Sequence, residues 1–128
     1  MKKILWLARH EPLPVQAAEL ERLFGEVEIR QDVNPFKNAE EIKQRFERGG
    51  YDDLVVVAPL WVIFYLTELG VYPLWADMQE VSFGEKFHLT FNGRFYLFNR
   101  FKRIVGIEIK FQDIETKNEI KGEKNGCK

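Results

Sequence analysis

Two short runs of apolar residues constrain the fold of this chain, and each run stops abruptly at a turn. Residues 54–58 read Leu-Val-Val-Val-Ala, a continuous and largely β-branched run. Such a run is typical of a central parallel strand that is covered on both faces. Residues 4–8 form a second apolar run, which ends at Arg9 and His10 because Pro12 and Pro14 forbid its continuation. Together, the two runs predict an α/β fold with a parallel sheet at its centre.

The segments between these runs predict further helices and strands. An apolar face of helical period begins at Pro14 and ends before Gly25, and a second helix begins at Asn38 and stops at Gly49. Residues 27–29 and 72–76 are expected to be strands, and the apolar residues 61–69 are expected to form a buried helix. We therefore expect a Rossmann-like open sheet with parallel strands in the order 2-1-3-4, numbered along the chain, and helices on both faces.

The last third of the chain changes to a two-residue alternation. Residues 86–91 and 94–98 flank Asn92 and Gly93, the strongest signal for a two-residue hairpin turn. Residues 104–111 also alternate and predict a third strand. A C-terminal antiparallel hairpin or meander thus follows the parallel sheet. We expect a single domain over residues 1–114, with a core at 1–81, a hairpin extension at 82–114 and a flexible polar tail at 115–128.

Charge and cysteine content narrow the setting in which the chain works. The formal net charge of -1 combines an acidic part, with 9 Lys and Arg against 15 Asp and Glu in residues 1–85, and a basic part, with 10 against 5 in residues 86–128. No stretch reaches the roughly 20 apolar residues of a membrane helix. The single cysteine, Cys127, excludes an internal disulfide. We expect a cytoplasmic protein without a membrane partner.

Polar side chains at the end of the first predicted strand mark a candidate site. In open α/β sheets, ligands bind at the carboxyl ends of the strands, where the strand order reverses. Arg9, His10 and Glu11 occupy that place in the sequence. An arginine fork can hold phosphate oxygens, and a histidine can donate or accept a proton. The alternative is that a turn carries polar residues because it faces water.

Three further side chains are expected on the same rim of the sheet. Asp32 and Asn34 follow the second predicted strand and Asp77 follows the fourth, where they would contact ribose or base edges. Asp and Asn are also common turn residues. No spacing is diagnostic of magnesium or zinc, and no glycine-rich dinucleotide motif or Walker lysine loop is present. We therefore expect neither a metal nor a cofactor.

Basic and aromatic residues interleave along the C-terminal hairpin, which leaves a second interpretation open. Such a surface can stack bases and hold phosphates. Packing of the aromatic side chains and contact with a second subunit explain the same pattern, so nucleic-acid binding is an alternative that we do not favour. Its candidate residues are Arg94, Arg100, Lys102 and Arg103.

The layout of residues 3–80 resembles that of small stand-alone CRISPR-associated ring nucleases, which are minimal members of the CARF (CRISPR-associated Rossmann fold) family. The similarity rests on the first strand ending in Arg-His, on Val-Val-Val-Ala-Pro-Leu-Trp-Val at residues 55–62 and on Gly-Val-Tyr-Pro-Leu-Trp at residues 70–75. Glu11, which precedes Pro12, departs from the Arg-His-Pro pattern of that family. The basic hairpin has no counterpart in it.

The resemblance implies a homodimer that binds a cyclic oligoadenylate in a basin shared by both copies. It also implies metal-independent cleavage to a 2′,3′-cyclic phosphate, which switches off type III CRISPR signalling. Arg9 would hold the phosphate, His10 would assist proton transfer, and the backbone at Leu60 and Trp61, next to Pro59, would cradle a nucleotide. A sensor or sponge that binds the ring without cleaving it remains open as an alternative.

Overall fold

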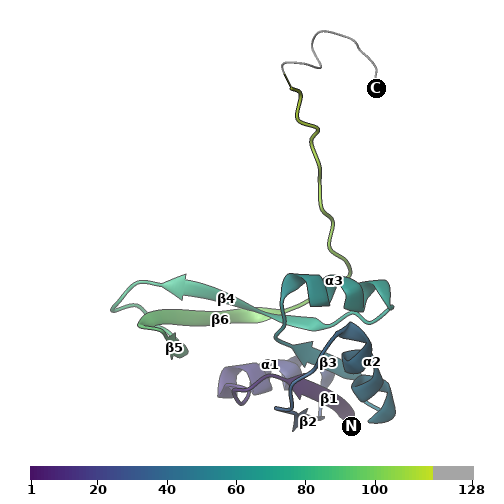
Figure 1. The fold of residues 1–128 in the computed structure, drawn as a ribbon. Coiled ribbons are helices and arrows are strands. Elements are labelled where there is room, and N and C mark those ends of the chain that lie inside the picture. The colour runs from purple at the N-terminus through teal and green to yellow at the C-terminus, as the bar shows by residue number, and fades with distance from the viewer. Residues whose placement is uncertain (117–128) are drawn as a thin grey trace.

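Six strands and three helices make up residues 1–116, the part of the chain that this computed structural model describes (Figure 1). The predicted polar tail falls largely outside the described residues, as does Cys127. The elements are β1 (Lys2–Leu7), α1 (Pro14–Phe24), β2 (Val27–Gln31), α2 (Ala39–Arg48), β3 (Asp53–Val56), α3 (Leu60–Glu68), β4 (Leu74–Val81), β5 (Leu89–Phe91) and β6 (Arg94–Arg103).

The six strands form one mixed sheet in the order β2-β1-β3-β4-β6-β5. Strand β1 pairs in parallel with β2 and β3, and β3 pairs in parallel with β4. Strand β6 pairs antiparallel with both β4 and β5. The predicted α/β class is confirmed. The expectation of an open parallel sheet is wrong, because β6 joins the same sheet antiparallel to β4, which makes the sheet mixed. The expected C-terminal antiparallel hairpin is matched in part, by β5 and β6.

Helices cover both faces of the sheet because the side chains of each central strand alternate between two cores. Leu5 and Leu7 of β1 pack with the buried residues of α2 and α3, whereas Ile4 and Trp6 pack with Leu20 of α1. Strand β3 alternates in the same way. This alternation explains why both runs are apolar throughout: neither face of the strand meets water.

Strands β4 and β6 form a long ribbon that projects from the body of the domain (Figure 1). The sequence predicted a strand at residues 72–76, but β4 runs from Leu74 to Val81, and β6 extends to Arg103 rather than ending at residue 98. The predicted hairpin turn is present, with positive φ at Asn92 and Gly93. Its first strand, predicted from residue 86, is only Leu89–Phe91.

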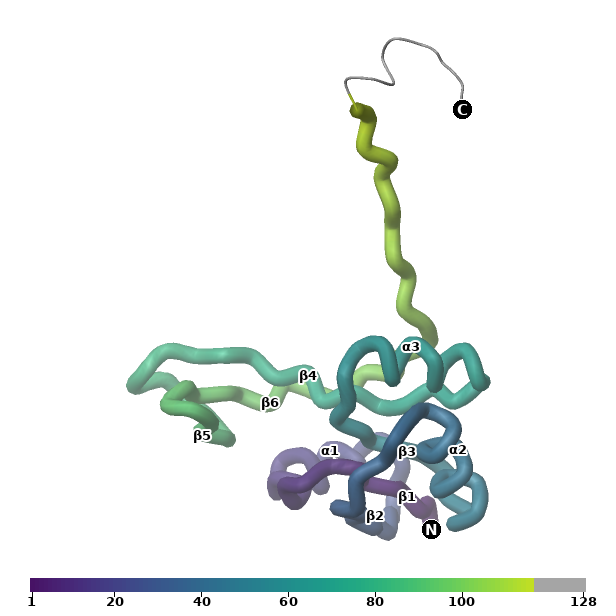
Figure 2. Tube along the Cα trace, in the orientation of Figure 1, coloured from purple at the N-terminus to yellow at the C-terminus, as the bar shows by residue number. Residues whose placement is uncertain are grey.

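The strand predicted at residues 104–111 is absent. The backbone N–H of Ile104 donates to the carbonyl of Pro73 at 2.9 Å, and beyond that point the described chain runs away from the body (Figure 2). Apolar and polar residues do alternate at 104–111, but a strand also needs a neighbouring strand with which to form backbone hydrogen bonds.

The helix boundaries are close to the predicted ones. Helix α1 begins at Pro14, and α2 begins after Asn38, whose side chain accepts a hydrogen bond from the backbone of Glu41 at 2.9 Å. Helix α3 spans Leu60–Glu68, one residue earlier than expected. Within residues 1–116, every helix is too short or too polar to cross a membrane.

Candidate functional site

A crevice of about 390 Å³ lies at the carboxyl ends of β1, β2 and β3, where the connections through α1 and α2 leave the sheet on opposite faces. We call it the carboxyl-end crevice. Its position is the one predicted from the ending of the first strand. It is lined by Leu7, Ala8, Arg9, His10, Asp32, Val33, Asn34, Pro35, Phe36 and Val57.

His10 has one imidazole nitrogen committed and one available. Nδ1 lies 3.0 Å from the carbonyl oxygen of Glu11, which can only accept a hydrogen bond. This contact places a ring proton on Nδ1, and Nε2 has no hydrogen-bond partner within residues 1–116. Trp6 fixes the turn at His10 through two contacts. Its Nε1 donates a hydrogen bond to the His10 carbonyl at 3.0 Å, and the centroids of the two rings lie 6.1 Å apart in an edge-to-face arrangement.

Arg9 is exposed, and its guanidinium has no hydrogen-bond or ion-pair partner within residues 1–116. Its backbone is held, because Gln31 Nε2 donates to the carbonyls of Ala8 and Arg9, each at 3.1 Å. By contrast, five other arginines pair with carboxylates: Arg22, Arg30, Arg45, Arg94 and Arg103. The turn therefore presents a fixed backbone and an uncompensated cation.

The wall of the crevice formed by residues 32–36 is organised by Arg45 of α2. Its Nη1 donates to Asp32 Oδ2 at 3.3 Å and to the Asn34 carbonyl at 2.9 Å, and its Nη2 bonds the Pro35 carbonyl and Glu41. Asp32 also accepts from the backbone of Asn34 at 2.9 Å. Asp32 and Asn34 therefore lie at the crevice as predicted, but the Asp32 carboxylate is already engaged. Sequence reasoning missed Arg45 because its partners lie 4 to 13 residues away.

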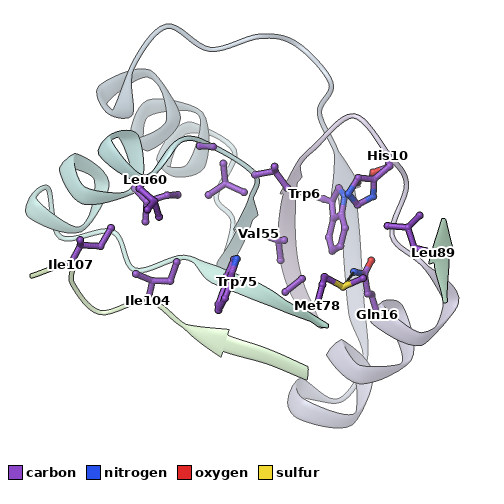
Figure 3. A pocket seen from close by; sticks show the side chains of 15 residues that line it. Trp6, His10, Gln16, Val55, Leu60, Trp75, Met78, Leu89, Ile104 and Ile107 are labelled. Atoms are coloured by element: carbon purple, nitrogen blue, oxygen red, sulfur yellow. Dashed lines mark hydrogen bonds between the residues drawn. The ribbon is translucent and has the colours of Figure 1, made fainter. Parts of the chain in front are cut away.

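A second hollow, which we call the β3–β4 cavity, adjoins the crevice (Figure 3). It measures about 470 Å³ and exists because β3 and β4 share a single pair, Val55 with Leu74, before they diverge. His10 and Val57 line both hollows, so the two lie side by side. The cavity is lined by Trp6, His10, Gln16, Val55, Val56, Val57, Ala58, Leu60, Ile63, Trp75, Ala76, Met78, Leu89, Ile104 and Ile107.

Gln16 supplies an amide to this otherwise apolar cavity. The side chain is buried; its Oε1 accepts from the Leu13 backbone at 2.9 Å, and its Nε2 has only Met78 Sδ at 3.9 Å (Figure 3). Sulfur is a weak acceptor, so Nε2 retains donor capacity toward the cavity. Sequence reasoning missed Gln16 although the chain carries a signal for it, since Gln16 lies one helical turn before the buried Leu20, on an apolar face.

The start of α3 contributes Leu60 to the cavity but directs Trp61 elsewhere. The backbones of Val62 and Ile63 donate to the Pro59 carbonyl, and the first two helical N–H groups have no acceptor within the described chain. Trp61 lies at neither hollow, and its ring meets Tyr65 edge to face at 6.4 Å. The expected ligand-binding position of Trp61 is therefore not at either hollow, whereas Leu60 is at the cavity and Pro59 directly precedes it.

Two predicted site residues are placed differently from expectation. Asp77 lies inside β4, opposite Arg100, and forms an ion pair with Lys102 at 3.4 Å, so it is not on the rim of the crevice. The strand continues past it because β6 pairs alongside. Glu11 is exposed next to the crevice, and its carbonyl rather than its carboxylate contacts His10.

The basic residues of the hairpin are mostly neutralised by neighbouring acids. Arg94 pairs with Glu80 at 3.3 Å, Lys102 pairs with Asp77, and Arg103 forms a two-pronged contact with Asp53 at 2.7 and 2.9 Å. Arg100 has no ion pair among the described residues, but it is close enough to help lower the pKa of Glu19, which Arg22 lowers mainly by hydrogen bonding. This arrangement does not favour the nucleic-acid alternative.

Comparisons of the chain with protein-family models, curated proteins and solved structures find no match. Within residues 1–116, no three His, Cys, Asp or Glu side chains are grouped so that they could hold a metal ion. The resemblance to ring nucleases therefore remains a prediction, and any function for this chain has to be argued from the geometry of the two hollows.

Proposed function

We propose that this protein binds a cyclic oligoadenylate, with a phosphate in the carboxyl-end crevice and an adenine in the β3–β4 cavity, and cleaves it. The observation that carries the proposal is the Arg9 guanidinium, which has no partner within residues 1–116, beside His10 at a crevice next to an apolar cavity. A cation and an apolar cavity, side by side, match the two halves of a nucleotide.

The phosphate half is served by charge. Arginine binds phosphate through parallel N–H donors, and Arg9 has no competing carboxylate within residues 1–116. The engaged Asp32 carboxylate, held by Arg45, repels an incoming anion less than a free one would.

The base half is served by shape and by one amide. Trp75 and Leu60 offer apolar surface to a planar ring, and a glutamine amide can pair with the N6 and N7 edge of adenine. Gln16 Nε2, with only a sulfur neighbour, can donate in this way. The apolar lining and the Gln16 amide favour a purine ligand over a bare phosphate.

The reaction is an internal transesterification. The ribose 2′-oxygen attacks the adjacent phosphorus, the bond from phosphorus to the 5′-oxygen breaks, and a 2′,3′-cyclic phosphate and a 5′-hydroxyl result. His10 Nε2 takes the proton of the 2′-hydroxyl, and the leaving 5′-oxygen takes one from the resulting imidazolium or from water. Arg9 stabilises the charge that develops on the phosphoryl oxygens. The rate comes from holding the reacting groups in position and from stabilising the charge on the phosphoryl oxygens. Neither needs a metal ion, so we expect the cleavage to proceed in EDTA.

A non-catalytic sensor is the second candidate. One observation favours it: within residues 1–116, His10 is the one histidine at the crevice, because Nδ1 of His88 accepts a bond from the Phe98 backbone on the ribbon. No second histidine of residues 1–116 is therefore placed to protonate the leaving 5′-oxygen as a general acid.

The test is incubation of the purified protein with cyclic tetra- and hexa-adenylate in EDTA, followed by chromatography of the products. We expect a linear cyclic-phosphate product, slowed about a hundredfold or more in His10→Ala and Arg9→Ala. Arg48→Ala, which removes an exposed arginine at the far end of α2, is the matched control and should retain full activity. An intact ring that still binds would favour the sensor; an intact ring without binding would overturn both proposals.

A further inference from the structure

Beyond Ile107, the C-terminal segment (residues 104–115) is not covered by any other part of the described chain, and neither is the outer face of α3. We propose that they cover each other between two copies of the chain: the segment of each copy packs across α3 of the other, in a reciprocal two-fold exchange. This inference is independent of the proposed ligand and of any turnover.

The segment has the side chains of a strand but no neighbour. Ile104 and Ile107 pack against the core on the α3 side of the sheet, and beyond them the chain leaves the body (Figure 2). The apolar side chains farther along are bare, with Phe111 88% and Ile114 87% exposed. Residues 105–115 make no hydrogen bond within the described chain. An extended backbone with exposed large apolar groups is stable only when something covers it.

Helix α3 has the opposite deficiency: it is apolar on the side that the core does not use. Val62, Ile63 and Leu66 are buried, yet Trp61 and Tyr65 on the outer side are 56% and 53% exposed. No charged residue occurs in the helix before Glu68. A helix that is apolar all round is normally buried all round. The patch continues beyond the helix through the exposed Leu69 and Tyr72.

The lengths of the two surfaces match. Eight extended residues, 108–115, span roughly 26 Å, whereas nine helical residues span about 14 Å. The segment can therefore cross α3 and also reach Tyr72. Glu108, Lys110 and Asp113 lie among the apolar positions and would remain in water.

A second copy fits better than the chain's own helix. The root of the segment is fixed beside α3 by the packing of Ile104 and Ile107, and the remainder runs away from that helix (Figure 1). A two-fold axis brings the same segment of a second copy toward α3 and covers both deficient surfaces in one contact. To cover its own α3, the segment of a single chain would have to turn back toward the helix after Ile107.

Sedimentation velocity of the full chain and two exposed-site variants tests the exchange. The donor variant is Ile109→Asp with Phe111→Asp, and the acceptor variant is Trp61→Asp with Tyr65→Asp. The wild type should sediment as a dimer, and each variant should raise the dimer dissociation constant at least about a hundredfold. Phe83→Asp with Phe91→Asp, equally exposed at the end of the ribbon, is the matched control and should change it little. A monomeric wild type, or a donor variant that remains dimeric, overturns the proposal.

Mixing the donor and acceptor variants supplies a sharper criterion. The mixture contains one intact segment and one intact α3 face, so a heterodimer should form more tightly than either variant self-associates. No recovery would overturn reciprocal exchange. If a variant fails to fold by circular dichroism, Phe111→Cys and Tyr65→Cys in separate Cys127→Ser chains replace it. A disulfide between the two chains then supports the contact, and its absence under oxidation refutes it.

Discussion

At the scale of single residues, the ion pair of Asp53 and Arg103 connects the two halves of the molecule. Asp53 opens β3 and is only 4% exposed, and Arg103 closes β6. The guanidinium meets both carboxylate oxygens and also donates to the Tyr72 carbonyl at 2.9 Å. The hydrogen bond from Arg103 to Asp53 raises the pKa of Arg103 further above its already high ordinary value. A buried carboxylate without such a partner is costly.

Arg103→Ala should therefore lower the free energy of unfolding by about 2 kcal/mol, less than for a fully buried pair because the arginine is partly exposed. Urea denaturation measures the change. Arg100→Ala is the matched control on the same strand: its side chain has no ion pair among residues 1–116, and we expect a change within about 0.5 kcal/mol. Equal losses in the two variants would contradict this role for Arg103.

Glu41 makes the free energy of unfolding depend on pH in the acidic range. Its hydrogen bond with Arg45, and a second from the Lys37 backbone, hold the pKa of Glu41 below its ordinary value. A carboxyl group whose pKa falls on folding stabilises the protein above its unfolded pKa, and this contribution is lost as the pH falls through the folded pKa. The stability advantage of the wild type over Glu41→Gln should thus be largest near neutral pH and shrink below about pH 4. Urea unfolding across that range measures it; a constant difference would contradict the assignment.

The residue scale also shows what sequence can and cannot reveal about the site. Arg9 and His10 were predicted because an apolar run stops at them, which is a local signal. The roles of Gln16 and Arg45 depend on partners that only the folded chain brings together, Met78 for the first and Asp32 for the second. Local patterns locate the ends of strands, whereas side-chain partnerships across elements arise only once the chain has folded.

At the scale of elements, a β-bulge explains why the ribbon was mispredicted. Asp77 pairs with Arg100 and Met78 with Phe98, so Asn99 is an extra residue on β6. The bulge lets Phe98 and Phe101 face the same core although they are three residues apart, and Phe101 meets Trp6 edge to face at 6.2 Å. Strict alternation breaks at Asn99, so a strand predicted from period two ends there. Residues 104–111 show the converse: alternation is present, but no strand of the described chain pairs with it.

Deleting Asn99 should destabilise the fold strongly because one of the two phenylalanines must leave the core. We expect a loss of roughly 3 kcal/mol, the scale of removing a buried aromatic side chain, measured by urea denaturation. Asn99→Ala keeps the bulge and removes only an exposed side chain, so it should cost less than about 0.5 kcal/mol. A deletion as mild as the substitution would show that the bulge is not required.

At the scale of the whole molecule, the inner end of the ribbon packs on the body, whereas its outer end is only partly buried. Leu74, Phe98 and Phe101 are buried in the core, and Arg103 pairs with Asp53, although the β3–β4 ladder has one pair. The outer part of the ribbon extends past these contacts (Figure 1), and Leu89 of β5 returns to line the β3–β4 cavity. Stretches with little buried apolar packing open locally without global unfolding.

Hydrogen exchange should therefore distinguish the two parts. Amides in the outer ribbon, such as those of Val81 and Phe95, should exchange about a hundredfold faster than those of Leu5 and Val55 in the central strands. Mass spectrometry after pepsin digestion resolves these segments. Equal protection in both would show that ribbon and body open only together.

The single pair between β3 and β4 also has a thermodynamic consequence for any occupant of the cavity that it creates. A molecule seated there touches Val55 and Ala58 on the body and Trp75 and Met78 on the ribbon, so it connects the two parts across the gap in the ladder. Part of the binding free energy then suppresses local opening of the ribbon, and we expect the ribbon amides to exchange more slowly when the cavity is occupied. The ligand takes the place of the backbone pairs that β3 and β4 do not form.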